Sequence, residues 1–145
     1  MSIMEDIQNA MKEALRNRDT PRLECLRMAK GALLVKEKEA PDALNDEVAV
    51  TILRSEVKKR QQSIEIFREH DKETEAVAAE AEIAVLEEFL PQQLSPEQLE
   101  ERVRAYAAEH PEITHAGKLT GALKKELGDA ADGRLLNELC RSVLE

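Results

Sequence analysis

Residues able to carry nucleophilic chemistry are few in this chain. Cys25 and Cys140 are its two cysteines, and each has apolar neighbours in the sequence. A nucleophilic thiol needs a lowered pKa or a nearby base, and no histidine lies near either cysteine in sequence. We interpret both cysteines as core residues whose thiols stay free in a reducing compartment. No catalytic residue is expected, and whether the protein is an enzyme is left open, with absence of activity favoured.

Metal and phosphate sites are not predicted either. Zinc requires several Cys or His residues at short spacing, whereas His70, His110 and His115 are scattered. Glu112 and His115 match one half of a di-iron motif, but that site needs a second such pair and further carboxylates. The segment 117–120 resembles the end of a phosphate-binding loop, yet Glu112 stands where that loop requires its first glycine. We therefore expect no metal and no cofactor.

Two groups of basic residues remain as candidates, and the first is the run Lys58, Lys59 and Arg60. Three consecutive residues point to different sides of a helix, so at least one of them faces a neighbouring helix. Ion pairs with glutamates of the following helix, such as Glu80, Glu82 or Glu87, are the favoured interpretation. Contact with a phosphate or another anion is the alternative.

The second group lies between residues 117 and 141. Lys118 and Lys125 are seven residues apart and share one helical face. Gly117 and Gly121 are four apart and share a face as well, and a missing side chain lets another backbone approach closely. Tight packing on the next helix is the favoured explanation for the glycines. The alternative is the approach of an RNA sugar-phosphate backbone beside the lysines.

The composition favours an all-α fold. Of 145 residues, 42% are hydrophobic, 35% are charged and only 2% are aromatic. The apolar fraction is too high for a disordered chain. The scarcity of strand-forming and aromatic residues argues against a β-sandwich, a barrel or an aromatic surface for single strands.

The charge is strongly negative and unevenly distributed. The net charge of −9 argues against a nonspecific nucleic-acid binder, which needs clustered positive charge. Residues 41–94 carry 6 basic and 13 acidic side chains, whereas residues 117–145 carry 5 of each. The C-terminal segment can therefore present a basic face. Charges throughout residues 2–15 predict no signal peptide, and no apolar run approaches membrane-spanning length, so we expect a cytoplasmic protein without membrane contact.

Capping residues and apolar spacing predict seven helices. The residues expected at their starts are Ser2, Pro21, Asn45, Asp71, Ser95, Thr114 and Asp132. The apolar positions expected on the second helix include Leu23, Leu26, Met28, Leu33 and Val35. The third and fourth helices are long and closely joined, which predicts an antiparallel hairpin. We expect two helical subdomains: residues 1–92, with four helices including this hairpin, and residues 93–145, with three helices.

Five strings of residues occur in order along the chain. They are Arg22-Leu23-x-x-Leu26-Arg27-Met28, Glu56-Val57-Lys58-Lys59-Arg60-x-x-Ser63-Ile64-x-x-Phe67, Glu87-x-x-Leu90-Pro91-x-Gln93-Leu94-Ser95, Gly117-Lys118-Leu119-x-Gly121-Ala122-Leu123 and Ala131-Asp132-Gly133-x-Leu135-x-Asn137-Glu138. Together they resemble the YqeY-like family (GatB/YqeY domain). Members of this family are small bacterial proteins similar to the C-terminal tail of GatB, one of the subunits of the aspartyl/glutamyl-tRNA amidotransferase.

The resemblance implies two all-helical subdomains and a link to tRNA. In the amidotransferase the tail helps to hold the tRNA elbow, while the amidation chemistry lies elsewhere. The family is often labelled with carbon–nitrogen ligase activity that uses glutamine as amido-N-donor. This chain lacks the cradle domain and the metal- and ATP-binding parts of GatB, so the label can apply to it only as a component or relative of such a system.

Two hypotheses follow from the residues and the resemblance. The first is a stand-alone, non-catalytic helical module associated with tRNA or another RNA. Its candidate RNA-binding residues are Lys118, Gly121, Lys125 and Arg134, with Lys58, Lys59 and Arg60 as a second basic candidate. The alternative is an acidic helical adaptor that docks a protein partner on the predicted hairpin. The sequence does not fix the oligomeric state.

Overall fold

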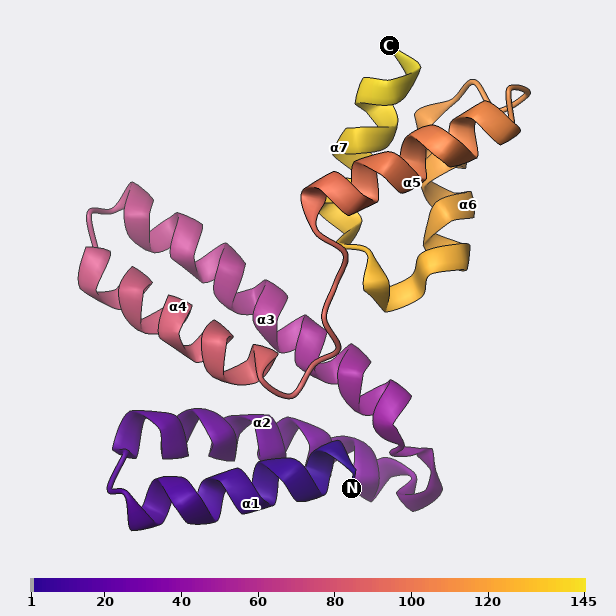
Figure 1. The fold of residues 1–145 in the computed structure, drawn as a ribbon. Coiled ribbons are helices and arrows are strands. Elements are labelled where there is room, and N and C mark those ends of the chain that lie inside the picture. The colour runs from indigo at the N-terminus through magenta and orange to yellow at the C-terminus, as the bar shows by residue number, and fades with distance from the viewer. Residues whose placement is uncertain (1) are drawn as a thin grey trace. The chain divides into compact units, whose positions relative to one another are not determined.

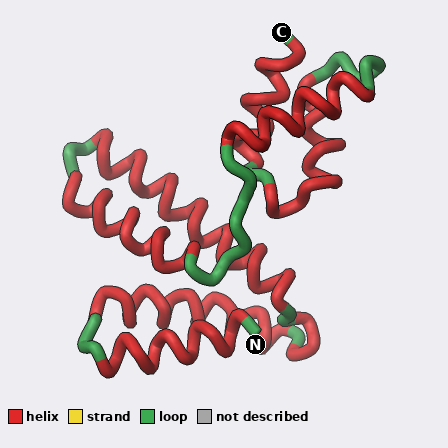
Figure 2. Tube along the Cα trace, in the orientation of Figure 1, coloured by secondary structure: helices red, strands yellow, loops and turns green. Residues whose placement is uncertain are grey.

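The computed structural model describes residues 2–145, and helices joined by loops account for this part of the chain (Figure 1). No strand occurs in the described residues, which confirms the predicted all-α fold (Figure 2). The chain divides into two compact units, one ending at Leu90 and one running from Pro91 to Glu145. We call them the N-terminal unit and the C-terminal unit and describe each by itself.

The N-terminal unit consists of two helical hairpins. The first is formed by α1 (Ile3–Arg16) and α2 (Thr20–Glu39), and a short 3-10 turn at Pro41–Ala43 follows it. The second is formed by α3 (Asp46–Glu69) and α4 (Glu73–Glu87), as Figure 1 shows. The residues of the shared core include Ile7, Leu26, Leu33, Leu53 and Leu86, all at most 1% exposed. Burial of such side chains contributes roughly 1.5–3 kcal/mol each, so this core holds the two hairpins together.

Polar contacts fix where these helices begin. The Ser2 hydroxyl accepts a hydrogen bond from the Glu5 amide at 3.1 Å, and the Asn45 side chain accepts one from the Val48 amide at 2.9 Å. Both caps were expected from the sequence. The Ile3 amide also donates to the Asp46 carboxylate at 3.0 Å, which joins the first turn of α1 to the first turn of α3.

Two expectations for this unit are wrong. Asp71 does not cap α4: it lies in the turn after α3 with a φ of 56°, and the capping position belongs to Lys72, whose side chain makes no capping bond. Met28 and Val35 do not join the core, because they are 57% and 59% exposed. Helix α2 buries a face that contains Cys25, Leu26, Ala29 and Leu33, and Met28 and Val35 lie on the opposite side.

The C-terminal unit consists of α5 (Pro96–Glu109), α6 (Ala116–Leu127) and α7 (Gly133–Leu144), with a 3-10 turn at Gly128–Ala130. Its own core contains Leu99, Val103, Leu119, Leu123, Leu136 and Cys140. The segment before α5 is tied to the turn between α6 and α7. The Leu94 amide donates to the Ala130 carbonyl at 2.8 Å, and the Gln93 side chain donates to the Asp129 carbonyl at 3.0 Å.

The predicted capping residues are confirmed for α5 and α7, and the prediction for α6 is wrong. Ser95 and Gln98 form the predicted capping box, in which each side chain bonds the other residue's backbone amide. Asp132 caps α7 as expected. Thr114, however, does not cap α6, because the His115 ring accepts a hydrogen bond from the Gly117 amide at 3.0 Å.

Candidate nucleic-acid interface

The outer face of α6 holds three of the four predicted RNA-binding residues. Leu119 and Leu123 turn inward and are buried. Lys118, Gly121 and Lys125 follow one another at spacings of three and four residues and are all exposed. Helical geometry therefore places the three on one solvent-facing stripe, opposite the core. The sequence predicted the shared face of the two lysines, and the structure adds that Gly121 lies between them.

Open space surrounds Gly121. A Cβ atom built at this position meets no heavy atom within 4 Å, so packing of α6 on α7 does not require a glycine here. This rules out the explanation that the sequence favoured. Gly117 differs, because a Cβ there would lie 3.0 Å from the His115 ring that caps the helix. The cap accounts for Gly117, whereas nothing within the described residues accounts for Gly121.

The α6 lysines are not neutralised within the protein. Helix α6 contains three lysines, Lys118, Lys124 and Lys125, and a single acidic residue, Glu126. None of the three lysines forms an ion pair with another residue of the 2–145 range. Unpaired ammonium groups on one helix attract phosphate oxygens, and they do so despite the negative charge of the whole chain.

Arg134, the fourth predicted residue, is exposed in the first turn of α7. The Arg134 amide donates a hydrogen bond to the Asp132 carboxylate that caps the helix. The Arg134 guanidinium lies 3.8 Å from Glu138, one turn further along the helix. Sequence reasoning missed Lys124, whose ammonium lies 3.8 Å from the Cβ position of Gly133, the residue before Arg134. Lys124 could have been included from the sequence, because it is adjacent to Lys125 and adjacent residues cover neighbouring sides of a helix. We call Lys118, Gly121, Lys124, Lys125 and Arg134 the α6 basic face.

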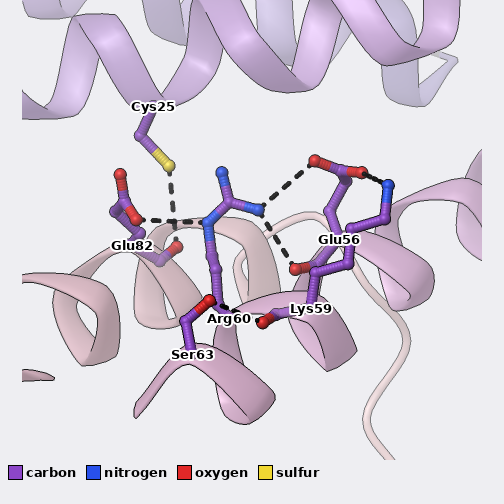
Figure 3. A network of polar contacts seen from close by, with 6 residues as sticks. All are labelled: Cys25, Glu56, Lys59, Arg60, Ser63 and Glu82. Carbon is purple, nitrogen blue, oxygen red and sulfur yellow. Dashed lines mark hydrogen bonds and ion pairs between the residues drawn. The ribbon is translucent and has the colours of Figure 1, made fainter. Parts of the chain in front are cut away.

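The three residues of the second basic candidate, Lys58, Lys59 and Arg60, have different surroundings. Arg60 is buried, at 8% exposure, and its Nε lies 3.2 Å from Glu82 of α4 (Figure 3). Its Nη1 donates to the Glu56 carboxylate at 3.3 Å and to the Glu56 carbonyl at 3.1 Å. Lys59 pairs with the same carboxylate at 3.1 Å, and Lys58 is exposed. The predicted ion pair with a glutamate of the next helix is confirmed for Arg60, so its guanidinium is already occupied.

Both thiols are buried, and the Cys25 Sγ donates to the Glu82 carbonyl at 3.6 Å (Figure 3). Cys25 is 1% exposed and Cys140 is fully buried, and neither forms a disulfide. Burial raises the pKa of Cys25, and the charge of Arg60 offsets this only in part. Burial also raises the pKa of Cys140. Thiols with raised pKa are poor nucleophiles, which agrees with their interpretation as core residues.

Two of the three histidines, His110 and His115, lie at the loop between α5 and α6, whereas His70 follows the end of α3. The Tyr106 and His110 rings stack with centroids 4.2 Å apart, and His110 lies 3.2 Å from the Glu112 carboxylate. The pKa of Glu112 is lowered mainly by a hydrogen bond between its carboxylate and its own backbone, and to a smaller extent by the contact with His110. Across residues 2–145, no three His, Cys, Asp or Glu side chains come together in a group suited to a metal ion. Glu112 and His115 thus stay a partial motif.

None of the described helices is both long enough and apolar enough to span a bilayer. A comparison with curated proteins gives no match to the chain. The model of the family described as Yqey-like protein matches residues 4–144. The match includes all five strings and both units. On this ground the chain belongs to the YqeY-like protein family.

Proposed function

We propose that this protein is a non-catalytic module that binds structured tRNA weakly, with the α6 basic face as the contact surface. Membership in the YqeY-like family is consistent with a stand-alone relative of the C-terminal tail of GatB. The observation that carries the proposal is the stripe of Lys118, Gly121 and Lys125, with open space above the glycine and no ion pair at either lysine.

The geometry suits a sugar-phosphate backbone better than a base. Lysines contact phosphate as point charges and carry no sequence information. A helix that lacks a side chain between two lysines lets a phosphate ridge approach the helix backbone, and each ammonium then reaches a phosphate on its own side. Recognition of this kind reads RNA shape, which is the usual mode for structured RNA.

Few contacts and a net charge of −9 make this binding weak and salt-dependent. If the three α6 lysines each neutralise one phosphate, the slope of log affinity against log salt is about −2.1 to −2.7. Affinity should then fall roughly 20- to 40-fold between about 50 and about 200 mM salt. No chemical step is assigned to the protein, so any role in amidation belongs to a partner enzyme that uses the same tRNA.

The proposal is tested by titrating the full chain against an unmodified tRNA transcript and following fluorescence anisotropy at these two salt concentrations. The variant Lys118→Glu with Lys125→Glu should abolish saturable binding while circular dichroism stays unchanged, because both side chains are exposed. Lys12→Glu with Lys38→Glu is the matched control, with the same charge change on exposed positions of the N-terminal unit. Equal affinity of the α6 variant and the wild-type chain would disprove the proposal.

A further inference from the structure

Helix α4 exposes an uncharged face that no described element covers. The residues of this face are Thr74, Val77, Ala78, Ala81 and Ala84, all of them exposed. Val77 and Ala78 are adjacent and the other neighbours are three residues apart, so the five lie on one side of the helix over about three turns. Val77 is 54% exposed. We call these five residues the outer α4 face.

The opposite side of α4 is already used for folding. Ala76, Ala79 and Leu86 are buried against α3 and α2. A surface helix ordinarily carries charged residues opposite its core face, whereas α4 is apolar on both sides. The high helix propensity of alanine accounts for exposed alanines, but it does not account for Val77, because β-branched residues lower that propensity. The outer α4 face therefore has the character of an unoccupied contact surface.

Glutamates border the outer α4 face on both sides. Glu73, Glu80 and Glu87 recur every seven residues along one border, and Glu75 and Glu82 do so along the other. Helix α4 contains no Lys or Arg. Arg68 of α3 pairs with Glu73 and Glu80, and Arg60 pairs with Glu82.

The remaining two glutamates define the charge that a partner must bring. Glu75 and Glu87 have no ion-pair partner within residues 2–145, and one lies on each border. They stand in a segment, residues 41–94, that carries a net charge of −7. Opposite charges on a partner would be attracted to both borders at once.

We propose that the outer α4 face docks an amphipathic helix of a protein partner, one whose apolar seam is flanked by Lys or Arg. The small side chains of Ala78, Ala81 and Ala84 let a second helix approach closely, and the partner's basic flanks meet the glutamate borders. A second copy of this chain fits poorly, because pairing two α4 helices face to face would place glutamates beside glutamates. The occupant is thus a basic helix and not another α4.

The test uses the full chain, labelled with ¹⁵N, and a synthetic helical peptide of about 15 residues. The peptide has a Leu/Ala seam and Lys on both flanks, and the comparison peptide has the same composition with Lys placed in the seam. We expect saturable shifts of the amide signals from residues 74–84 with the first peptide only. Ala81→Lys, which replaces one exposed helical residue by another good helix former, should weaken binding at least about tenfold. Ala105→Lys on the exposed side of α5 is the matched control and should bind as the wild-type chain does.

Three results would overturn the proposal. One is equal binding of both peptides, which would show attraction to negative charge without a defined face. Another is unchanged affinity in Ala81→Lys. The third is a dimer of the free chain, detected by light scattering and lost in Ala81→Lys, which would show that a second copy occupies the face.

Discussion

Gly121→Ala is expected to stabilise the C-terminal unit and to weaken its binding to RNA. The residue lies in the middle of α6, with helix on both sides. A Cβ at this position enters empty space, because no heavy atom lies within 4 Å of it. The substitution therefore adds a methyl group to the surface without any steric cost in the folded protein.

The expected gain in stability comes from the backbone alone. Glycine in a helix interior is about 1 kcal/mol less favourable than alanine, mainly because it loses more conformational freedom on folding. The free energy of unfolding should thus rise by about 1 kcal/mol. With a typical urea dependence of about 1–3 kcal/mol per M, the midpoint moves up by about 0.3–1 M.

Gly31 provides a matched control in the other unit. It lies inside α2, and a Cβ built on it also meets nothing within 4 Å. Gly31→Ala should give the same gain of about 1 kcal/mol. Because Gly31 is not part of the α6 basic face, its substitution should leave RNA affinity unchanged.

Urea denaturation and the anisotropy titration together separate the two effects. If RNA approaches the α6 backbone at Gly121, the new methyl group obstructs it, and a loss of about 1 kcal/mol lowers affinity about fivefold. A stabilised Gly121→Ala with wild-type affinity would show that the lysines bind without close approach. A destabilised Gly121→Ala would refute the open geometry itself.

Two further substitutions test polar groups that fix each unit. Arg60→Met removes the buried donor to Glu56 and Glu82 and should lower the free energy of unfolding by about 2 kcal/mol in urea denaturation. Glu82→Gln keeps an acceptor for Arg60, so an equal loss in that variant would contradict the assignment. Ser95→Ala removes the hydroxyl that bonds the Gln98 amide and should cost about 1 kcal/mol in the same assay. Ser95→Asp retains an acceptor, and stability should largely return; failure to do so would argue against the cap.

Local chemistry made most of the fold predictable from the sequence. The caps at Ser2, Asn45, Ser95 and Asp132 depend on side chains that reach an amide two or three residues ahead. The two capping predictions that are wrong have a similar origin. Asp71 and Thr114 have the right chemistry for a cap, but the loops place Lys72 and His115 at the capping positions.

Tertiary contacts were less accessible from the sequence. That Arg60 is the buried member of its run could have been read from helical phase, because it lies three residues after Val57 and four before Ile64, both buried. Its choice of Glu82 on α4 depends on the register of the hairpin, which no local pattern fixes. The open space at Gly121 depends on how α6 packs, so the sequence alone favoured the wrong explanation there.

The two buried thiols allow local opening of each unit to be measured by thiol modification, without any added label. Cys25 lies in the core of the N-terminal unit and Cys140 in the core of the C-terminal unit, so a reagent reaches each only when the unit around it opens. The rate of modification at each thiol then measures the free energy of that opening. Two different free energies would show that the two cores open separately, in keeping with the predicted division into residues 1–92 and 93–145. One shared value means a single cooperative structure.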